Sequence, residues 1–299
     1  MPMLSIIVPT FNSAATIGRC LDSIRNQTYS DFEIVVQDGL STDNTLDIVL
    51  EFQKANNSIE VQTECVKDRG AYDAMNRAVS RARGTWLYFL GSDDELNDEN
   101  VLKEAMNSEH VDNNDVLYGN VRVVGDGLAA HDSIYDGPFD LLKLLRRNIC
   151  HQAIFYRADL GRRVGSFNLD YPVWADWDFN LRCWALTRFT YIDLVVAKFY
   201  AGGISSKQND ERFRRDIWVQ VTHDFGFSLL DPVVNDPTFV GRPGVIERQR
   251  AKGKLYSLSG LALRGILKLR REARALFTQR TRYFARSRRL GRFLAHRGS

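Results

Sequence analysis

Two adjacent carboxylates, Asp93 and Asp94, follow a run of five bulky apolar residues, Trp86 to Leu90. The run predicts a short strand that is buried on both faces. Like charges this close raise each other's pKa, and a hard divalent cation that bridges to a phosphate would remove that cost. Ligands of open α/β sheets bind outside the carboxyl ends of the strands. The two acids are therefore predicted to form the floor of a nucleotide site. The alternative is an ordinary acidic turn before the next helix.

Apolar runs along the chain predict buried strands, and amphipathic segments between them predict helices. Strands are expected at residues 4–8, 32–36, 59–63, 86–90, 116–124, 148–156 and 191–200, and helices at about 13–26, 46–52, 71–83, 99–108, 158–164 and 175–184. This alternation is typical of an α/β fold with a mostly parallel sheet that is covered by helices on both sides. Right-handed crossovers would bring the loops at Pro9, Asp38 and Asp93 to one edge of that sheet. We expect these three polar loops to form one site.

The length of 299 residues allows one large α/β domain, or one domain with an appendage. Four cysteines are scattered without the spacing of a metal site or of a disulfide framework, which favours a reducing compartment. The first apolar run is only as long as a strand and ends at Pro9, so we expect no secretion signal. No stretch approaches the roughly 20 apolar residues of a membrane span. The protein is therefore expected in the cytoplasm.

Charge divides the chain into an acidic body and a basic tail. Residues 242–299 carry 17 Lys and Arg against two Glu, a balance of +15, which leaves −12 for residues 1–241. The tail can form helices with one apolar side, made of Ile266, Leu269, Ala273, Leu276, Phe277, Phe284 and Leu294. Such basic amphipathic helices suit an anionic membrane surface. A solvated tail is the alternative. Nucleic-acid binding is not expected, because no recognition motif accompanies the charge.

Six segments together resemble the family 2 glycosyltransferases, the inverting enzymes of the GT-A fold, over roughly residues 3–205. The segments are Ile7–Asn12, Gln37–Thr45, Asp68–Asn76, Phe89–Asp94, Cys150–Gln152 and Ala175–Asp178. The Tyr-Asp-Ala-Met-Asn run at 72–76 is similar to the subgroup that builds bacterial polysaccharides and glycolipids. The resemblance implies a GT-A domain over residues 1–240, with a nucleotide-binding half (1–125) and an acceptor-binding half (126–240), followed by a basic helical extension over 241–299.

The resemblance also implies how a nucleotide sugar would be held. Pro9, Thr10, Asn12 and Asp38 would bind the nucleoside, with the Asp38 carboxylate accepting from the imide N–H of uracil, which favours a uridine-linked donor. A turn before a capped helix also explains Asp38. Asp94 would coordinate Mn²⁺ or Mg²⁺ on the diphosphate, and Asp93 would lie by the ribose or the water ligands of the metal. Ser92 stands where a strict Asp-x-Asp motif has its first acid, so one direct protein ligand is expected.

Asp176 matches the position of the family's catalytic base, which would take the proton of the acceptor hydroxyl as the hydroxyl attacks the anomeric carbon. The alternative is a cap for a helix that begins at Trp177, and both roles are compatible because a helix N-terminus favours an ionised carboxylate. The family usually has glutamate before this aspartate, whereas this chain has Ala175. Asp178 is therefore a second candidate.

Four further residues match the family's motifs on the donor side. Arg69 would contact the diphosphate or the base, and Asp73 the sugar or the ribose. Capping and helix surface are the alternatives for Asp73. His151 and Gln152 would contact the donor sugar or the acceptor, and the alternative for the histidine is a structural role.

We therefore expect an inverting, metal-dependent transferase that moves a sugar from a nucleotide sugar to a surface polysaccharide or glycolipid precursor. Its acceptor would be lipid-linked or an oligosaccharide, so docking on the inner face of the cell membrane would be useful. One alternative is a sugar-phosphate nucleotidyltransferase. The other is a membrane-associated scaffold that keeps the transferase fold without activity.

Overall fold

The computed structural model describes residues 1–125, 132–200 and 209–225. The basic amphipathic helices expected over residues 241–299 lie outside the described residues.

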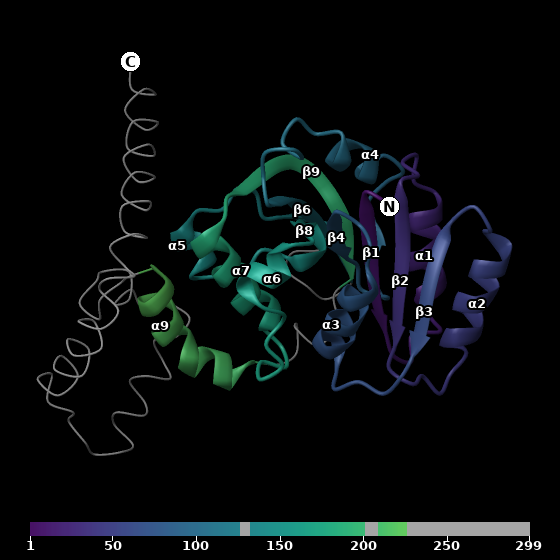
Figure 1. Cartoon of the computed structure of the whole chain (residues 1–299), viewed down its shortest axis with the longest axis horizontal. Coiled ribbons are helices and arrows are strands. Elements are labelled where there is room, and N and C mark those ends of the chain that lie inside the picture. Colours follow the sequence, from purple (N-terminus) through teal and green to yellow (C-terminus); the bar gives the residue numbers. More distant parts are fainter. Residues whose placement is uncertain (126–131, 201–208, 226–299) are drawn as a thin grey trace, which may run out of the picture. The chain divides into compact units, whose positions relative to one another are not determined.

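The N-terminal half contains the expected parallel sheet, with strands in the order β3, β2, β1, β4. The strands are β1 (Leu4–Thr10), β2 (Phe32–Asp38), β3 (Glu60–Cys65) and β4 (Trp86–Phe89). Three helices connect them in turn, namely α1 (Ile17–Arg25), α2 (Thr45–Ala55) and α3 (Ala71–Arg81). Figure 1 shows β1, β2 and β3 side by side, with α1 and α2 next to them. The alternation of strand and helix in the sequence is thereby confirmed.

Beyond β4 the sheet becomes mixed. It continues through β8 (Ile154–Arg157), β6 (Val116–Val124), β9 (Phe189–Tyr200) and β5 (Glu95–Leu96), with β7 (Ile134–Tyr135) on β6. β8 runs antiparallel to both β4 and β6, whereas β6 and β9 run parallel. The helices of this half are α4 (Val101–Met106), α5 (Leu141–Leu144), the short 3₁₀ helix η1 (His151–Ala153), α6 (Leu160–Val164), α7 (Ala175–Leu186) and α9 (Glu211–Phe225).

The buried strands divide their side chains between two cores. Ile6, Ile34 and Tyr88 face α1, α2 and α4, whereas the neighbouring residues Ile7 and Val35 face α3, α7 and α9. Because successive side chains of a strand point to opposite faces, a continuous apolar run is what a strand with helices on both sides requires. This explains why β1 and β2 are buried along their whole length.

The parallel strands end together at one edge of the sheet. Thr10 of β1 is in register with Asp38 of β2, and Asp38 is in register with Cys65 of β3. The sequence predicted that β1 ends at Pro9, but the strand continues to Thr10. At this point β1 pairs with β2 alone, since its register with β4 stops at Ile7, so the missing N–H of Pro9 costs little. The loops after β1, β2 and β4 thus lie at a common edge, as predicted.

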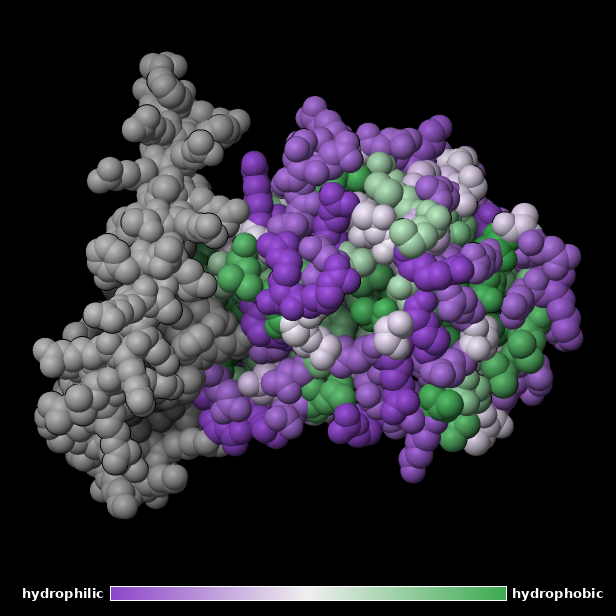
Figure 2. Space-filling model, viewed as in Figure 1, coloured by the Kyte–Doolittle hydropathy of each residue, from purple (hydrophilic) through white to green (hydrophobic). Residues whose placement is uncertain are grey.

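Polar residues cover most of the described surface on the side seen in Figure 2, with apolar residues scattered among them. Among the described residues, no helix is both long enough and apolar enough to cross a bilayer.

Candidate active site

Asp38 is the last residue of β2, at the edge of the sheet where the parallel strands end. Its side chain is buried, and its two carboxylate oxygens accept from the Ser41 N–H at 2.9 Å, the Ser41 hydroxyl at 2.5 Å and the Cys65 thiol at 3.0 Å. Oδ1 of Asn12 accepts from the Thr42 N–H at 2.8 Å, and the Asn12 N–H donates to Ser41 Oγ at 2.8 Å. The loop after β1 and the loop after β2 are therefore fastened to each other, which fixes the Asp38 carboxylate.

Thr10 and Phe11, at this edge of the sheet, offer groups that a ligand could contact. The Thr10 hydroxyl is buried, and it has no hydrogen-bond partner within the described part of the chain. Buried polar groups are normally satisfied, so such a group suits a ligand. Phe11 is 60% exposed and Leu40 is 47% exposed, although both are large apolar side chains. Phe11 follows Thr10, which is in register with Asp38, and an exposed aromatic ring in that loop is suited to stack on a planar base. Neither Phe11 nor Leu40 is among the site residues predicted from the sequence.

Asp93 and Asp94 fold back over Gly91. A Cβ at Gly91 would lie 2.8 Å from Oδ1 of Asp93 and 2.9 Å from Oδ2 of Asp94, so the two carboxylates converge on the space that glycine leaves. Asp93 is half-buried, whereas Asp94 is 1% exposed. The loop is tied to its neighbours, because Ser92 Oγ lies 2.9 Å from Ser13 Oγ and Arg19 donates to the Asp93 carbonyl at 2.6 Å.

Burial and the neighbouring Asp93 raise the pKa of Asp94 to about 7. Hydrogen bonds from the Tyr200 N–H to Oδ1, at 2.8 Å, and from Gln152 Nε2 to Oδ2, at 2.5 Å, offset part of this cost. Each carboxylate oxygen keeps a second lone pair for another partner. The negative charge of Asp94 is thus expensive in the folded protein unless a cation is near.

The donor set at this point fits a divalent cation that shares its ligands with a nucleotide. The described part of the chain contains no cluster of three or more His, Cys, Asp or Glu side chains that could hold a metal ion. Mg²⁺ commonly takes one or two carboxylates, substrate phosphates and water. The convergence of Asp93 and Asp94 over Gly91 supplies that number of oxygen ligands.

His151 and Gln152 join the two ends of the predicted site through the short helix η1. Gln152 donates to Asp94, while His151 Nδ1 lies 3.8 Å from Oδ2 of Asp176. Nε2 of His151 is buried and has no hydrogen-bond partner among the described residues. The candidate metal ligand and the candidate base therefore lie on either side of two consecutive residues.

Asp176 and Asp178 have different surroundings, although both lie in the first turn of α7. Asp176 accepts from the Tyr72 hydroxyl and from Asn148 Nδ2, both at 2.8 Å. Asp178 forms an ion pair with Arg182 at 2.7 Å, one turn further along the helix. The helix begins at Ala175, as predicted, with Trp174 at the cap position, so the alternative in which Asp176 caps a helix starting at Trp177 is wrong.

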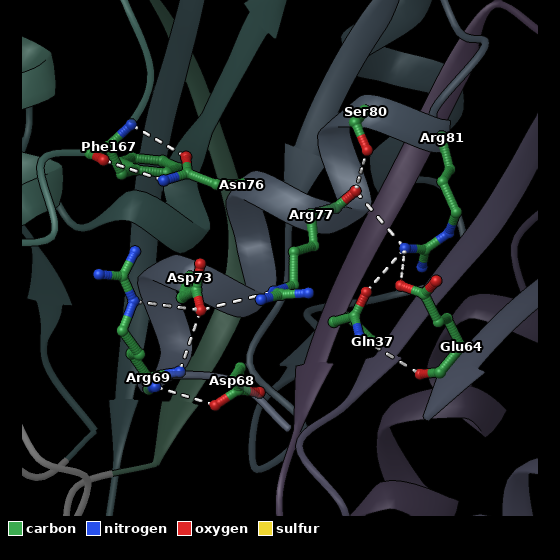
Figure 3. Close-up of polar contacts among 11 residues, drawn as sticks. Gln37, Glu64, Asp68, Arg69, Asp73, Asn76, Arg77, Ser80, Arg81 and Phe167 are labelled. Carbon is green, nitrogen blue, oxygen red and sulfur yellow. Dashed lines mark hydrogen bonds and ion pairs between the residues drawn. The ribbon is translucent and has the colours of Figure 1, made fainter. Parts of the chain in front are cut away.

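Arg69 and Asp73 contact each other and are separate from the residues around Asp176. The buried Asp73 carboxylate accepts from the Arg69 N–H at 3.1 Å and pairs with Arg77 at 3.4 Å, as Figure 3 shows. The Arg69 side chain is 73% exposed. No hydrogen bond or ion pair of the described chain joins Asp73 to Asp38, Asp94 or Asp176. The geometry gives Asp73 a role in holding the start of α3.

Known proteins resemble this chain in sequence and in fold. Residues 5–156 match the family model described as glycosyl transferase family 2. A Mycobacterium bovis protein named as a PGL/p-HBAD biosynthesis glycosyltransferase is 46% identical over 220 residues, which cover 71% of this chain and 82% of that protein.

Two solved structures share the fold. One is S. aureus TarS 1–349 in complex with UDP-GlcNAc, with a TM-score of 0.61 and 22% identity over 83% of this chain and 79% of that chain. The other is the mannosyltransferase PcManGT from Pyrobaculum calidifontis in complex with GDP-Man and Mn²⁺, with a TM-score of 0.55 and 18% identity over 90% of this chain and 80% of that chain. The chain belongs to glycosyl transferase family 2 and is a glycosyltransferase with the GT-A fold.

Proposed function

We propose that the protein is an inverting glycosyltransferase that uses a uridine-linked sugar and Mn²⁺ or Mg²⁺ to extend a surface polysaccharide or glycolipid precursor. One observation carries this proposal, namely that Gln152 contacts Asp94 and the adjacent His151 faces Asp176. A donor diphosphate at Asp94 and an acceptor hydroxyl at Asp176 would thus meet across a single short helix.

In this reaction Asp176 accepts the proton of the acceptor hydroxyl while the hydroxyl oxygen forms a bond to the anomeric carbon. The bond from that carbon to the diphosphate oxygen breaks, and its electron pair leaves with the nucleoside diphosphate. Attack from the face opposite the leaving group inverts the anomeric centre. A cation on Asp94, when bound, neutralises the charge that develops on the diphosphate. His151 would reach the sugar or the acceptor through its unpaired Nε2.

Uridine specificity is the part of this proposal that rests on the base site. TarS was solved with UDP-GlcNAc and PcManGT with GDP-Man, so the shared fold does not select the base. The fixed, buried Asp38 carboxylate beside the exposed Phe11 supports uracil, because a carboxylate accepts from the imide N–H. The Arg69 side chain is exposed, and we propose that it contacts the diphosphate.

Calorimetric titration of the full chain with UDP, GDP, dTDP and ADP tests the proposal. With Mn²⁺ present, UDP is expected to bind at least about tenfold more tightly than GDP, and EDTA is expected to weaken UDP binding strongly. Asp38→Asn should reduce the preference for UDP, whereas Asp47→Asn, at an exposed position of α2, should leave it unchanged. Tighter binding of GDP, or UDP binding that is indifferent to EDTA, would overturn the assignment.

We further propose that the chain divides into a transferase domain at 1–240 and a basic extension at 241–299 that docks on anionic membranes. The support is the balance of +15 over residues 242–299. The full chain should float with vesicles that contain anionic lipid, and high salt should release it from them. It should not float with uncharged vesicles. Replacing Arg282, Arg286 and Arg289 with glutamine should weaken flotation.

The matched control for that experiment replaces three exposed basic residues of the body, Arg25, Lys54 and Lys103, with glutamine. This variant should float like the wild type, because each basic residue adds about 1 kcal/mol only when it lies near the surface of the membrane. Equal flotation of both variants and the wild type would end the membrane proposal.

A further inference from the structure

The carboxylate of Asp176 is held on both oxygens by side chains from separate parts of the chain. The Tyr72 hydroxyl of α3 lies 2.8 Å from Oδ1, and Asn148 Nδ2, from the loop before η1, lies 2.8 Å from Oδ2. We propose that Tyr72, Asn148 and Asn180 are positioning residues that fix the Asp176 carboxylate toward the acceptor. This inference rests on the proposed role of Asp176 as the base.

Asn148 is itself oriented by a chain of hydrogen bonds that ends in the core. Its Oδ1 accepts from Asn180 Nδ2 at 2.8 Å, and Oδ1 of Asn180 accepts from the Tyr156 hydroxyl at 2.7 Å. Asn180 is fully buried, and Tyr156 is 1% exposed. A buried network of this kind rigidifies the groups that it connects when every member is satisfied. The side chain of Asn148 therefore cannot turn away from Asp176 without leaving a buried amide unpaired.

The direction of these bonds fits an ionised carboxylate. An ionised Asp176 only accepts hydrogen bonds, so Asn148 must present its Nδ2 and turn its Oδ1 toward Asn180. Asn180 must then present its Nδ2 to Asn148 and its Oδ1 to Tyr156, whose hydroxyl donates. Each donor meets an acceptor along the whole chain. In this chain Asp176 takes part only as an acceptor.

Tyr72 provides the second anchor, from the opposite side. Its hydroxyl lies 2.7 Å from the Val173 carbonyl as well as 2.8 Å from Asp176, so its single proton is shared between two acceptors and links the carboxylate to the backbone just before α7. Burial and the nearby Asp176 raise the pKa of Tyr72 well above its usual value, which keeps the hydroxyl protonated as a donor.

Asn76, one turn further along α3, holds Phe167, at the start of the segment that leads to Asp176. Its amide makes two hydrogen bonds with the backbone of Phe167, at 2.9 Å and 3.0 Å, as Figure 3 shows. Residues four apart lie on one face of a helix. α3 therefore fixes the segment from Phe167 to Asp176 at two points, while Asp73 on the same helix holds Arg69 on the donor side.

The test measures UDP release from a panel of UDP-sugars, with water in place of the acceptor, and follows the sugar that the wild type hydrolyses fastest. Tyr72→Phe and Asn148→Ala should each lower kcat by about 10- to 100-fold, the loss expected for one hydrogen bond to a charged group. KM for the UDP-sugar should stay within about twofold of the wild type, because neither residue binds the donor. Asn114→Ala is the matched control, because this asparagine also makes two hydrogen bonds, but with His110 and Thr190 and not with Asp176.

A double-mutant cycle separates positioning from a merely structural role. In the Asp176→Asn background, Tyr72→Phe should change the residual rate by less than about twofold, because the two residues act as one unit. Tyr72→Phe keeps the ring that packs on Phe167, so the variant is expected to fold. Wild-type kcat in both single variants would overturn the positioning role alone. So would a loss of rate from Tyr72→Phe that is as large in the Asp176→Asn background as in the wild type. Undiminished hydrolysis by Asp176→Asn, or no hydrolysis of any UDP-sugar by the wild type, would instead overturn the proposed function on which it rests.

Discussion

Replacing Asp176 with asparagine is expected to slow sugar transfer by about 10²- to 10⁴-fold while UDP binding stays within about twofold of the wild type. An amide has nearly the shape of a carboxylate but cannot take the proton of the acceptor hydroxyl. The amide oxygen could still accept from Tyr72 or from Asn148, which now hold the carboxylate at 2.8 Å, so the fold around α7 should persist. UDP release measures the first effect, and calorimetry measures the second.

Asp178→Asn is the control that this chain itself offers. It changes the same chemical group two residues away, but it removes an ion pair with Arg182 instead of a group in the site. It should lower the free energy of unfolding by about 1–3 kcal/mol and leave the rate per folded molecule close to that of the wild type. If Asp178→Asn abolished transfer and Asp176→Asn did not, the assignment of the base would be reversed.

This pair also shows where prediction from sequence reaches its limit. The sequence makes Asp176 the first candidate and Asp178 the second, and it cannot separate them by position alone because both open the same helix. In an α-helix two residues that are two apart point in directions about 200° apart, so only one of them can face a given site. Which one faces it depends on where the helix lies against Tyr72 and Asn148, and that is set by tertiary packing.

The parallel half of the sheet could be predicted because its signals are local. Apolar runs of strand length, each followed by polar residues, predicted β1, β2 and β4, and they placed Asp38 at the end of β2 and Asp94 after β4. The pairing of the second half could not be predicted, because an apolar run such as β8 carries no mark of the direction of its neighbours. The hydrogen bond between Tyr72 and Asp176 joins residues 104 positions apart, and no short motif encodes such a contact.

Asp94 is expected to make the metal-free protein less stable as the pH rises from about 4 to about 7. The pKa of this carboxyl rises from its ordinary 3.8 to about 7 on folding. Between these values the folded chain keeps a proton that the unfolded chain has lost, so the free energy of unfolding falls with rising pH. A difference of about three pH units corresponds to about 4 kcal/mol, with a slope of about 1.4 kcal/mol per pH unit.

Urea unfolding in the presence of EDTA, between about pH 5.5 and 8.5, would measure this slope. The difference in the free energy of unfolding between the wild type and Asp94→Asn should fall with rising pH and level off above about pH 7, because asparagine does not titrate. Asp98→Asn, at an exposed position shortly after Asp94, is the matched control and should show no such slope. A flat difference for Asp94→Asn as well would show that the carboxyl is not held in the protonated form.

Mn²⁺ with UDP should reverse this loss, because a cation beside Asp94 compensates the charge that burial penalises. The gain in stability from the pair should therefore be larger at pH 8 than at pH 6, where binding must first displace the proton. Below about pH 7 the affinity for Mn²⁺ should fall about tenfold per pH unit in the wild type. In Asp94→Asn the same titration should show weak binding without this pH dependence. The cost of leaving Asp94 charged in the metal-free protein would then be the free energy that couples metal binding to the loss of the Asp94 proton.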